Sequence, residues 1–473
     1  MGRKLVVWNL VALAVVLALG AVYLVLAHNP VSGESSVVVF LENDPTDIRT
    51  LDVTNAYGSY EVYAEDDGYV VDDIPASIVN VEGFYELMYH GCAFGALKTI
   101  DAAPKDLAQY GLDDPQAAID VTFFDGTTFS MTIGDEEVVS GNYYGQVDGD
   151  RAVYLFSEED MIYFLCRKEA YITLQVTPEL AVSSPLSAIM DVTFSGSSLE
   201  KPITIEAVAD SNPQAELDAM SFGPATHIVR MKGTYELDQT YGIEILGSLF
   251  DIEALDVVGY NLTDGDFSKL GFDEPDMVVD FGMKNGTDTV SDYELSLVNV
   301  NDENYLINVS GTQVVYLIEK PAFVDVDYTK LMLHWFLSPL RLDLESLTVS
   351  FGGQTFVYQS GKNDDGTQYA FVNGKEMDID LFYSFYRLVT SAASDGQYLK
   401  DAVATGDPLM TITYAYLDPD KSPDVMTLYE GGTRRVYVDI NGVIEFDMKS
   451  SFVDAMELAC RHTVTGESIE ENW

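Results

Sequence analysis

The sequence predicts an α+β protein with an N-terminal transmembrane helix and three related modules, each an antiparallel sheet with a packed helix. Three features lead to this prediction. They are a long apolar run near the N-terminus, strand-like runs bounded by turn residues along the rest of the chain, and a turn sequence that occurs twice. At 473 residues the chain is long enough for about two to four domains.

The apolar run extends from Leu5 to Ala27, and Asn9 is its only strongly polar residue. As a helix it would be about 34 Å long, enough to cross a hydrocarbon core of about 30 Å. Arg3 and Lys4 precede the run and no Lys or Arg follows before Arg49. The positive-inside rule therefore predicts a single-pass protein of the cell membrane, with a cytoplasmic N-terminus and an extracytoplasmic bulk.

Residues 1–30 are thus predicted to be a cytoplasmic stub and a transmembrane anchor. A cleaved signal peptide is the alternative, because Val25-Leu26-Ala27 has small residues at plausible cleavage positions. The run is longer than the apolar core of a typical signal peptide, which favours the anchor.

The chain is strongly acidic, with 25 Lys and Arg against 77 Asp and Glu and a net charge of −52. Such a surface repels nucleic-acid phosphates and anionic lipid headgroups, so we expect no nucleic-acid partner. Hydrophobic residues make up 47% of the chain and aromatic residues 12%, which is ample for packed cores. Halophilic adaptation and an extracellular life among divalent cations would both account for the acidity.

A first module is predicted over residues 37–175. Its strands alternate apolar and polar residues and are bounded by Gly and Asp turns. They are Val37–Leu41, Tyr60–Ala64, Tyr69–Val71, Ile119–Phe124, Thr128–Ile133, Tyr143–Val147 and Ala152–Phe156. Phe84, Leu87, Met88 and Cys92 have helical spacing. Asp125-Gly126 predicts a tight hairpin.

The same order of elements returns twice, in a second module over 176–336 and a third over 337–462. Strands of the second are 189–194, 203–207, 227–232, 278–281, 293–298, 305–309 and 314–318, and its helix carries Ile243, Leu246 and Phe250. Strands of the third are 347–351, 355–359, 369–372, 410–416, 425–429, 436–440 and 443–448. Its amphipathic helix carries Leu381, Phe382, Phe385, Leu388 and Val389. A polar tail over 463–473 is expected to fray.

The repeated turn marks each module. It reads Tyr110-Gly111-Leu112-Asp113-Asp114-Pro115 in the first, Leu270-Gly271-Phe272-Asp273-Glu274-Pro275 in the second and Gly406-Asp407-Pro408 in the third. The spacing of the prolines, 160 and 133 residues, suits domain-sized modules and is too long for solenoid repeats. Gly111 and Gly271 are expected in turn conformations that disfavour a Cβ atom.

The stretch from about Leu107 to Leu155 resembles the domain-of-unknown-function 4340 family (DUF4340). The resemblance lies in the Tyr110–Pro115 turn, in Ile133-Gly134-Asp135, and in Tyr144 through Val147-Asp148-Gly149 to Val153-Tyr154. The second module keeps Leu270–Pro275 and Val315-Tyr316 but lacks an Ile-Gly-Asp equivalent, and the third keeps little beyond Asp407-Pro408 and Val438–Gly442. The resemblance implies a membrane-anchored extracytoplasmic protein associated with ABC transporters of the gliding-motility or auxiliary type. It implies no catalytic residues.

No catalytic, cofactor-binding or metal-ligating residues are predicted. The chain lacks Gly-x-Ser-x-Gly, His-Glu-x-x-His, a Gly-rich phosphate loop and Cys-x-x-Cys. Its five histidines, at positions 28, 90, 227, 334 and 462, stand singly and are more often structural. Asp418, Asp420, Ser422 and Asp424 resemble the start of a calcium loop, but Pro423 and Tyr429 occupy positions that need Gly and Glu. Cys92, Cys166 and Cys460 are expected to be buried free thiols, with a Cys92–Cys166 disulfide as the alternative.

These observations favour a non-enzymatic, membrane-anchored extracytoplasmic scaffold or accessory subunit of an ABC-type transport or envelope system, with a transporter permease as partner. Two alternatives stay open. Exposed coplanar aromatic residues among the 29 tyrosines would favour a cell-wall glycan-binding protein. A concave pocket with two carboxylates of separated pKa would favour a carboxylate-dependent hydrolase.

Overall fold

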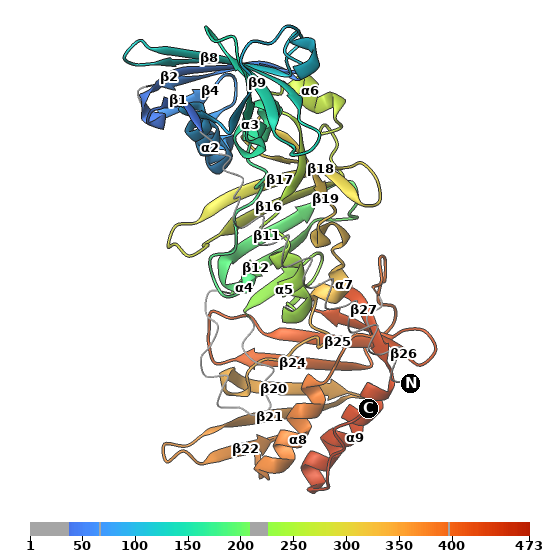
Figure 1. The fold of residues 1–473 in the computed structure, drawn as a ribbon. Coiled ribbons are helices and arrows are strands. Elements are labelled where there is room, and N and C mark those ends of the chain that lie inside the picture. Colours follow the sequence, from blue (N-terminus) through green and yellow to red (C-terminus); the bar gives the residue numbers. More distant parts are fainter. Residues whose placement is uncertain (1–36, 66–67, 209–225, 396–397) are drawn as a thin grey trace, which may run out of the picture. The chain divides into compact units, whose positions relative to one another are not determined.

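A computed structural model describes residues 37–65, 68–208, 226–395 and 398–473. The predicted anchor from Leu5 to Ala27 lies outside these residues. Within the described ranges, no helix combines the length and apolarity needed to cross a membrane. The chain divides into two compact units, of which the first ends at Thr173 and the second begins at Leu174. Three large antiparallel sheets and a small number of helices confirm the α+β class (Figure 1).

The first unit holds one eight-stranded sheet and a separate two-stranded sheet. The strands of the large sheet are β2 (Ile48–Asn55), β3 (Gly58–Glu65), β4 (Gly68–Val71), β6 (Lys98–Asp101), β7 (Ala117–Phe123), β8 (Thr128–Glu136), β9 (Tyr143–Val147) and β10 (Val153–Phe156). The small sheet pairs β1 (Val38–Glu42) with β5 (Ala93–Ala96). Two helices, α2 (Val81–Gly91) and α3 (Glu158–Leu165), pack beside each other.

The second unit holds a nine-stranded sheet and an eight-stranded sheet. The strands of the nine-stranded sheet are β11 (Ile189–Ser195), β12 (Ile203–Ala207), β13 (His227–Arg230), β14 (Thr234–Glu236), β15 (Ala254–Gly259), β16 (Met277–Met283), β17 (Ser291–Asn299), β18 (Asn304–Val309) and β19 (Val315–Glu319). Its helices are α4 (Pro185–Ala188), α5 (Gln239–Gly247), α6 (Asp264–Lys269) and α7 (Tyr328–Leu331).

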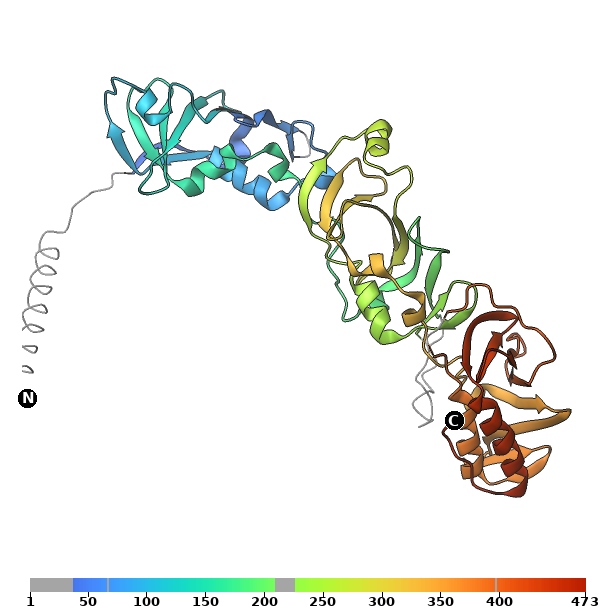
Figure 2. The same ribbon diagram turned by 90° about the vertical axis from the view of Figure 1, so that its right-hand side faces the viewer.

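The strands of the last sheet are β20 (Leu344–Phe351), β21 (Gln354–Lys362), β22 (Gln368–Val372), β23 (Lys375–Met377), β24 (Met410–Tyr416), β25 (Asp424–Glu430), β26 (Arg435–Ile440) and β27 (Val443–Lys449). Two helices, α8 (Ile379–Thr390) and α9 (Ser451–Thr465), accompany it. Figure 2 shows these two helices side by side against this sheet, in orange and red.

All three large sheets share one topology. In each, two meanders of consecutive strands meet at their first strands, and the junctions are β2 with β7, β11 with β16, and β20 with β24. A helix lies between the two meanders in sequence, α2 in the first sheet, α5 in the second and α8 in the third. This recurrence confirms the repeated sheet modules that the duplicated turn predicts.

The repeated turn occupies the same place in each module. Pro115, Pro275 and Pro408 each stand two residues before the strand that opens the second meander, which begins at Ala117, Met277 or Met410. The accompanying glycines have positive φ angles, +68° at Gly111, +93° at Gly271 and +85° at Gly406. The expectation for Gly111 and Gly271 is therefore confirmed.

The Ile133-Gly134-Asp135 strand end is explained by its contact with the first copy of the turn. A Cβ on Gly134 would lie 2.1 Å from the Tyr110 carbonyl oxygen, and a Cβ on Gly111 would lie 2.7 Å from the Asp135 backbone nitrogen. The two backbones thus approach too closely for side chains. In the second module Met277 pairs with Leu297, as Ala117 pairs with Ile133, so Val298 takes the place of Gly134. The contact there is looser.

Some elements differ from the prediction. No strand is predicted over Ile48–Asn55, yet β2 lies at the centre of the first sheet. An irregular register between Ile48 and Thr50 breaks the alternation that would have indicated a strand. Neither α3 nor α9 is predicted. The predicted face of α5 is also wrong at Ile243, which is 43% exposed. Because α5 ends at Gly247, Phe250 does not share a helical face with Ile243 and Leu246.

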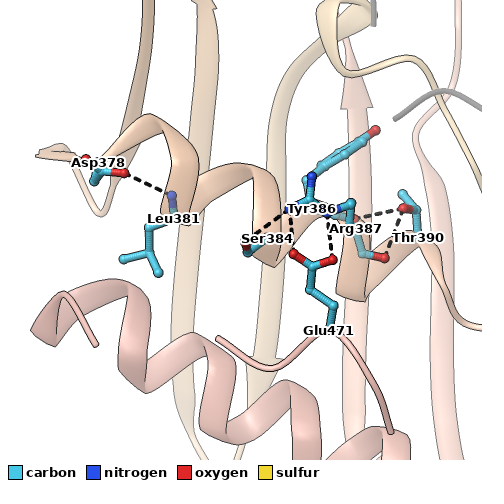
Figure 3. Close-up of polar contacts among 7 residues, drawn as sticks. All are labelled: Asp378, Leu381, Ser384, Tyr386, Arg387, Thr390 and Glu471. Carbon is cyan, nitrogen blue, oxygen red and sulfur yellow. Dashed lines mark hydrogen bonds and ion pairs between the residues drawn. The ribbon is translucent and has the colours of Figure 1, made fainter. Parts of the chain in front are cut away.

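The last residues of the chain do not fray as expected. They follow α9 and lie against α8, where the Arg387 guanidinium donates to both carboxylate oxygens of Glu471 (Figure 3). The Trp473 indole N–H donates to Ser391 Oγ at 2.9 Å, and its ring meets Phe452 edge to face at 5.3 Å. A charge-assisted pair, a hydrogen bond and an aromatic contact thus connect this segment to α8 and α9.

We expect Gly111→Ala to lower the free energy of unfolding of the first unit by roughly 3 kcal/mol, because both the positive φ angle and the close Asp135 backbone oppose a Cβ. Gly149→Ala is the matched control. Its φ of +79° is similar but nothing lies within 4 Å of the added carbon, so about 1 kcal/mol is expected. Amide hydrogen exchange on the whole chain measures each unit separately. Equal loss in both units, or equal effects of the two substitutions, would contradict this account.

Candidate functional site

Two of the histidines that stand singly in the sequence make structural contacts in the described part of the chain. His227 is buried and its Nε2 lies 3.1 Å from the Ile189 carbonyl oxygen. His462 contacts Glu467 and the Ser468 carbonyl. The three cysteines are free thiols, with Cys92 and Cys460 buried. Within the described ranges, no group of three or more His, Cys, Asp or Glu side chains is placed to hold a metal ion.

Two depressions lie on corresponding strands of the first and second sheets. One, of about 350 Å³, includes Asp120 of β7 in its lining, and the other, of about 620 Å³, includes Asp280 of β16. These two aspartates each stand five residues after the proline of the repeated turn. Asp120 pairs across the sheet with Asp52, and Asp280 with Glu294. Both depressions are therefore acidic and would attract cationic groups.

The carboxylates near Asp120 affect the pKa of Asp52, which lies opposite it in the sheet. Burial, and then the carboxylates of Glu61 and Asp120, raise the pKa of Asp52 above its ordinary value. Like charges directly opposite each other in a sheet are destabilising by a few tenths of a kcal/mol, about 0.2–1. The paired carboxylates thus lower the free energy of unfolding of the chain alone. A cationic partner would reduce the repulsion between them.

The most completely built polar site in the described chain centres on Glu445, which has no solvent exposure. Glu445 lies on β27 at an irregularity in the pairing with β26, where Val438 pairs with Phe446 and Asp439 with Ile444. This bulge leaves Glu445 without a cross-strand partner and turns its side chain to the interior. In a regularly alternating strand the Glu445 side chain would face outward, but the bulge places it in the interior.

Donors from the β13–β14 turn and from α7, both in the second module, satisfy the Glu445 carboxylate. The backbone N–H of Lys232 donates to Oε1 at 3.2 Å and that of Gly233 to Oε2 at 2.9 Å. The Tyr328 hydroxyl, at the start of α7, also donates to Oε2 at 2.9 Å. A Cβ on Gly233 would lie 2.8 Å from that oxygen, so the turn between β13 and β14 needs glycine here. Glu445 therefore joins the two sheets of the second unit.

An aromatic shell excludes water from this carboxylate. Tyr235, Tyr328, Tyr398 and Phe446 lie with their ring centroids 5.6–6.4 Å from one another along the contacting pairs. Burial, and then the negative charge of Glu445, raise the pKa of Tyr235 and of Tyr328 well above the ordinary range. The phenols therefore stay protonated, and Tyr328 can act as a hydrogen-bond donor throughout the physiological pH range.

Further contacts at the same junction are polar and more exposed. The Lys232 ammonium donates to the Lys400 carbonyl oxygen and lies 5.4 Å from the centre of the Tyr398 ring. Lys400 forms an ion pair with Glu200 at 3.2 Å. The Leu399 N–H donates to the Glu445 backbone carbonyl at 2.7 Å. All three oxygens of Glu445 thus accept hydrogen bonds from the protein, which joins the sheets and leaves none of these oxygens for a substrate.

A second feature lies on the surface of the first unit. Val81, Tyr85 and Tyr89 of α2 are 76%, 59% and 50% exposed. Residues four apart share a helical face, so these three form a line that we call the α2 ridge. The Tyr85 and Tyr89 rings are nearly parallel, at 19°, with centroids 6.5 Å apart. The opposite side of α2, with Leu87 and Met88, is buried as the helical spacing predicts.

Acidic residues flank the α2 ridge. Glu82 and Glu86 form the adjacent line on α2, and His90 ends that line. The His90 ring stacks on Tyr163 of α3 at 4.8 Å and lies between Asp160 at 3.1 Å and Glu86 at 3.6 Å. The sequence singles out the histidine and the buried face of α2 but not this ridge. The period of four in exposed apolar residues is the signal that would have found it.

We expect Glu445→Ala to lower the free energy of unfolding of the second unit by roughly 3–5 kcal/mol, because two backbone donors and the Tyr328 hydroxyl would lose their acceptor in a buried site. Glu445→Gln keeps one acceptor oxygen and should cost less. Glu430→Ala, at an exposed glutamate of the same sheet, is the control and should stay within about 0.5 kcal/mol. Urea denaturation measures all three, and a Glu445→Ala protein as stable as the control would contradict the role given to this carboxylate.

Comparison with known proteins gives one match. Residues 89–219 match the family model described as Domain of unknown function (DUF4340). No curated protein and no solved structure matches the chain significantly. The matched residues include the Gly111 turn and the Gly134 strand end, whose backbones contact each other. The similarity at residues 89–219 is thus to the DUF4340 family, as the resemblance of these motifs predicts.

Proposed function

We propose that this chain is a non-enzymatic extracytoplasmic scaffold or accessory subunit of an ABC-type transport or envelope system, anchored in the membrane by Leu5–Ala27. One observation carries the proposal. The most elaborate polar site, at Glu445, is fully buried and its hydrogen bonds join two sheets of the same chain. A polar site whose hydrogen bonds are all made within the chain supports a structural role, in which the protein presents its surface to a partner.

The acidic sheet faces support a partner with a neutral or basic surface. The net charge is −52, and carboxylates recur at Asp120 and Asp280 in corresponding depressions. A membrane tether would hold these faces beside other proteins of the same membrane. Confinement raises the effective concentration, so a weak interface is sufficient for association. A transporter permease is the partner we propose.

The proposal predicts that the full chain co-purifies in mild detergent with an integral membrane protein. Deleting residues 1–30 should weaken this association even though the sheets stay folded, because the tether supplies much of the effective concentration. Raising the salt should weaken it further, since exposed charges are screened over about 8 Å at physiological ionic strength. Crosslinking in intact cells that repeatedly yields no membrane partner would overturn the proposal.

Binding of cell-wall glycan is a second candidate, favoured by the nearly parallel Tyr85 and Tyr89 rings. Exposed aromatic side chains present an apolar face with a polar edge, which suits the apolar face of a sugar ring. Saturable binding of purified wall glycan to the full chain, lost when both tyrosines are replaced, would establish this function instead.

A further inference from the structure

The α2 ridge is an exposed apolar surface with a defined electrostatic surrounding. Val81, Tyr85 and Tyr89 each leave half or more of their surface to solvent. Helix α2 buries its other side, so the exposure is not a sign of a loosely packed helix. Exposed aromatic residues grouped along one line are typical of interaction surfaces, whereas single exposed apolar residues need no explanation.

The carboxylates of α2 and α3 outnumber their basic side chains. Neither α2 nor α3 contains a Lys or Arg, while α2 contributes Glu82 and Glu86 and α3 contributes Glu158, Glu159 and Asp160. Burial, and then the carboxylates of Glu86, Glu159 and Glu82, raise the pKa of Tyr163, so these acids act on the same region. The one basic side chain of the two helices, His90, is already placed between Glu86 and Asp160.

We propose that the α2 ridge and the Glu82–Glu86 line beside it dock a cationic segment of a partner protein, one that carries Arg or Lys side chains. A guanidinium group is planar and stacks on the face of a tyrosine ring. Its charge is then within reach of the neighbouring carboxylate line. An anionic lipid surface would be repelled by the same acids, and a neutral sugar would use the rings alone.

The spacing of the two lines adds a constraint on the partner. Tyr85 and Tyr89 are four residues apart, as are Glu82 and Glu86. Cationic side chains repeated every four residues on a partner helix would meet both lines in register. The inference rests on the scaffold function proposed above, because it names the chemistry of the partner that such a scaffold would hold.

A peptide-binding measurement on the full chain in non-ionic detergent tests the inference. The ligand is a synthetic 15-residue alanine-based helix with Arg at every fourth position, and its control has Gln in place of each Arg. At about 150 mM salt, fluorescence anisotropy should detect the Arg peptide and not the Gln peptide. Tyr85→Ser with Tyr89→Ser should weaken binding about 5- to 30-fold, the loss of two exposed cation–π contacts.

Matched variants separate the ridge from the general acidity of the chain. Tyr57→Ser, at a tyrosine that is 66% exposed in the turn after β2, should leave the affinity unchanged. Tyr85→Phe with Tyr89→Phe keeps the aromatic faces and should bind within about twofold of the unchanged protein. Glu82→Gln with Glu86→Gln should weaken binding and reduce its dependence on salt.

The outcomes are distinct. An affinity that does not change in the Tyr85→Ser, Tyr89→Ser protein would place the peptide elsewhere and overturn the inference, as would glycan binding lost in that variant while peptide binding persists. In intact cells, capture of the same membrane partner by this variant and the unchanged chain would leave the scaffold function standing and remove this docking surface. Capture of no membrane partner by either would overturn the scaffold function itself.

Discussion

The contact on which the second unit depends is the buried carboxylate of Glu445. A carboxylate removed from water needs protein donors for its oxygens, and leaving it without them costs several kcal/mol. The Lys232 and Gly233 amides and the Tyr328 hydroxyl supply these donors, and all three belong to the neighbouring sheet module. Separating the two sheets would remove these donors from the buried charge, which is consistent with both sheets lying in one compact unit that begins at Leu174.

Local features of the chain serve this contact. The bulge in β27 turns Glu445 inward, and the absence of a side chain on Gly233 lets the turn approach the carboxylate. The aromatic rings around the site exclude water and keep the hydrogen bonds strong. A second pair of backbones approaches closely in the first unit, at Gly111 and Gly134, but there the contact lies within one sheet module and involves no buried charge.

Much of the architecture could be predicted from the sequence, because strands and turns produce local patterns of apolar residues, glycines and prolines. Alternation locates β24 at its observed bounds of Met410–Tyr416, and the prolines at 115, 275 and 408 mark corresponding strands. Contacts between distant residues are not encoded in this way. Glu445 lies in a predicted strand between Ile444 and Phe446. Nothing in the local sequence indicates a bulge that turns its side chain toward the interior. The C-terminal segment is a second example, since its Glu471 pairs with Arg387, a residue far away in the sequence.

The distribution of polar groups separates two roles in this molecule. Inside the second unit, they connect sheets; on the sheet faces and along α2, carboxylates gather without enough cations of the chain to neutralise them. The DUF4340 match at residues 89–219 includes the Gly111 turn and the Gly134 strand end, whose close backbone contact lies within the first unit. The acidic surfaces are the part of the described chain that is open to a partner, and the function proposed above uses them.

Native-state hydrogen exchange at the Gly233 amide is the most direct test of this account. If the bond from this amide to Glu445 is part of the core of the second unit, Gly233 should exchange only through the opening that releases central-strand amides such as Ile412, despite lying in a turn. A similar exchange free energy for Gly233 and Ile412 is the predicted result. Exchange of Gly233 at the rate of an exposed turn, while Ile412 stays protected, would show that Glu445 does not join the two sheets.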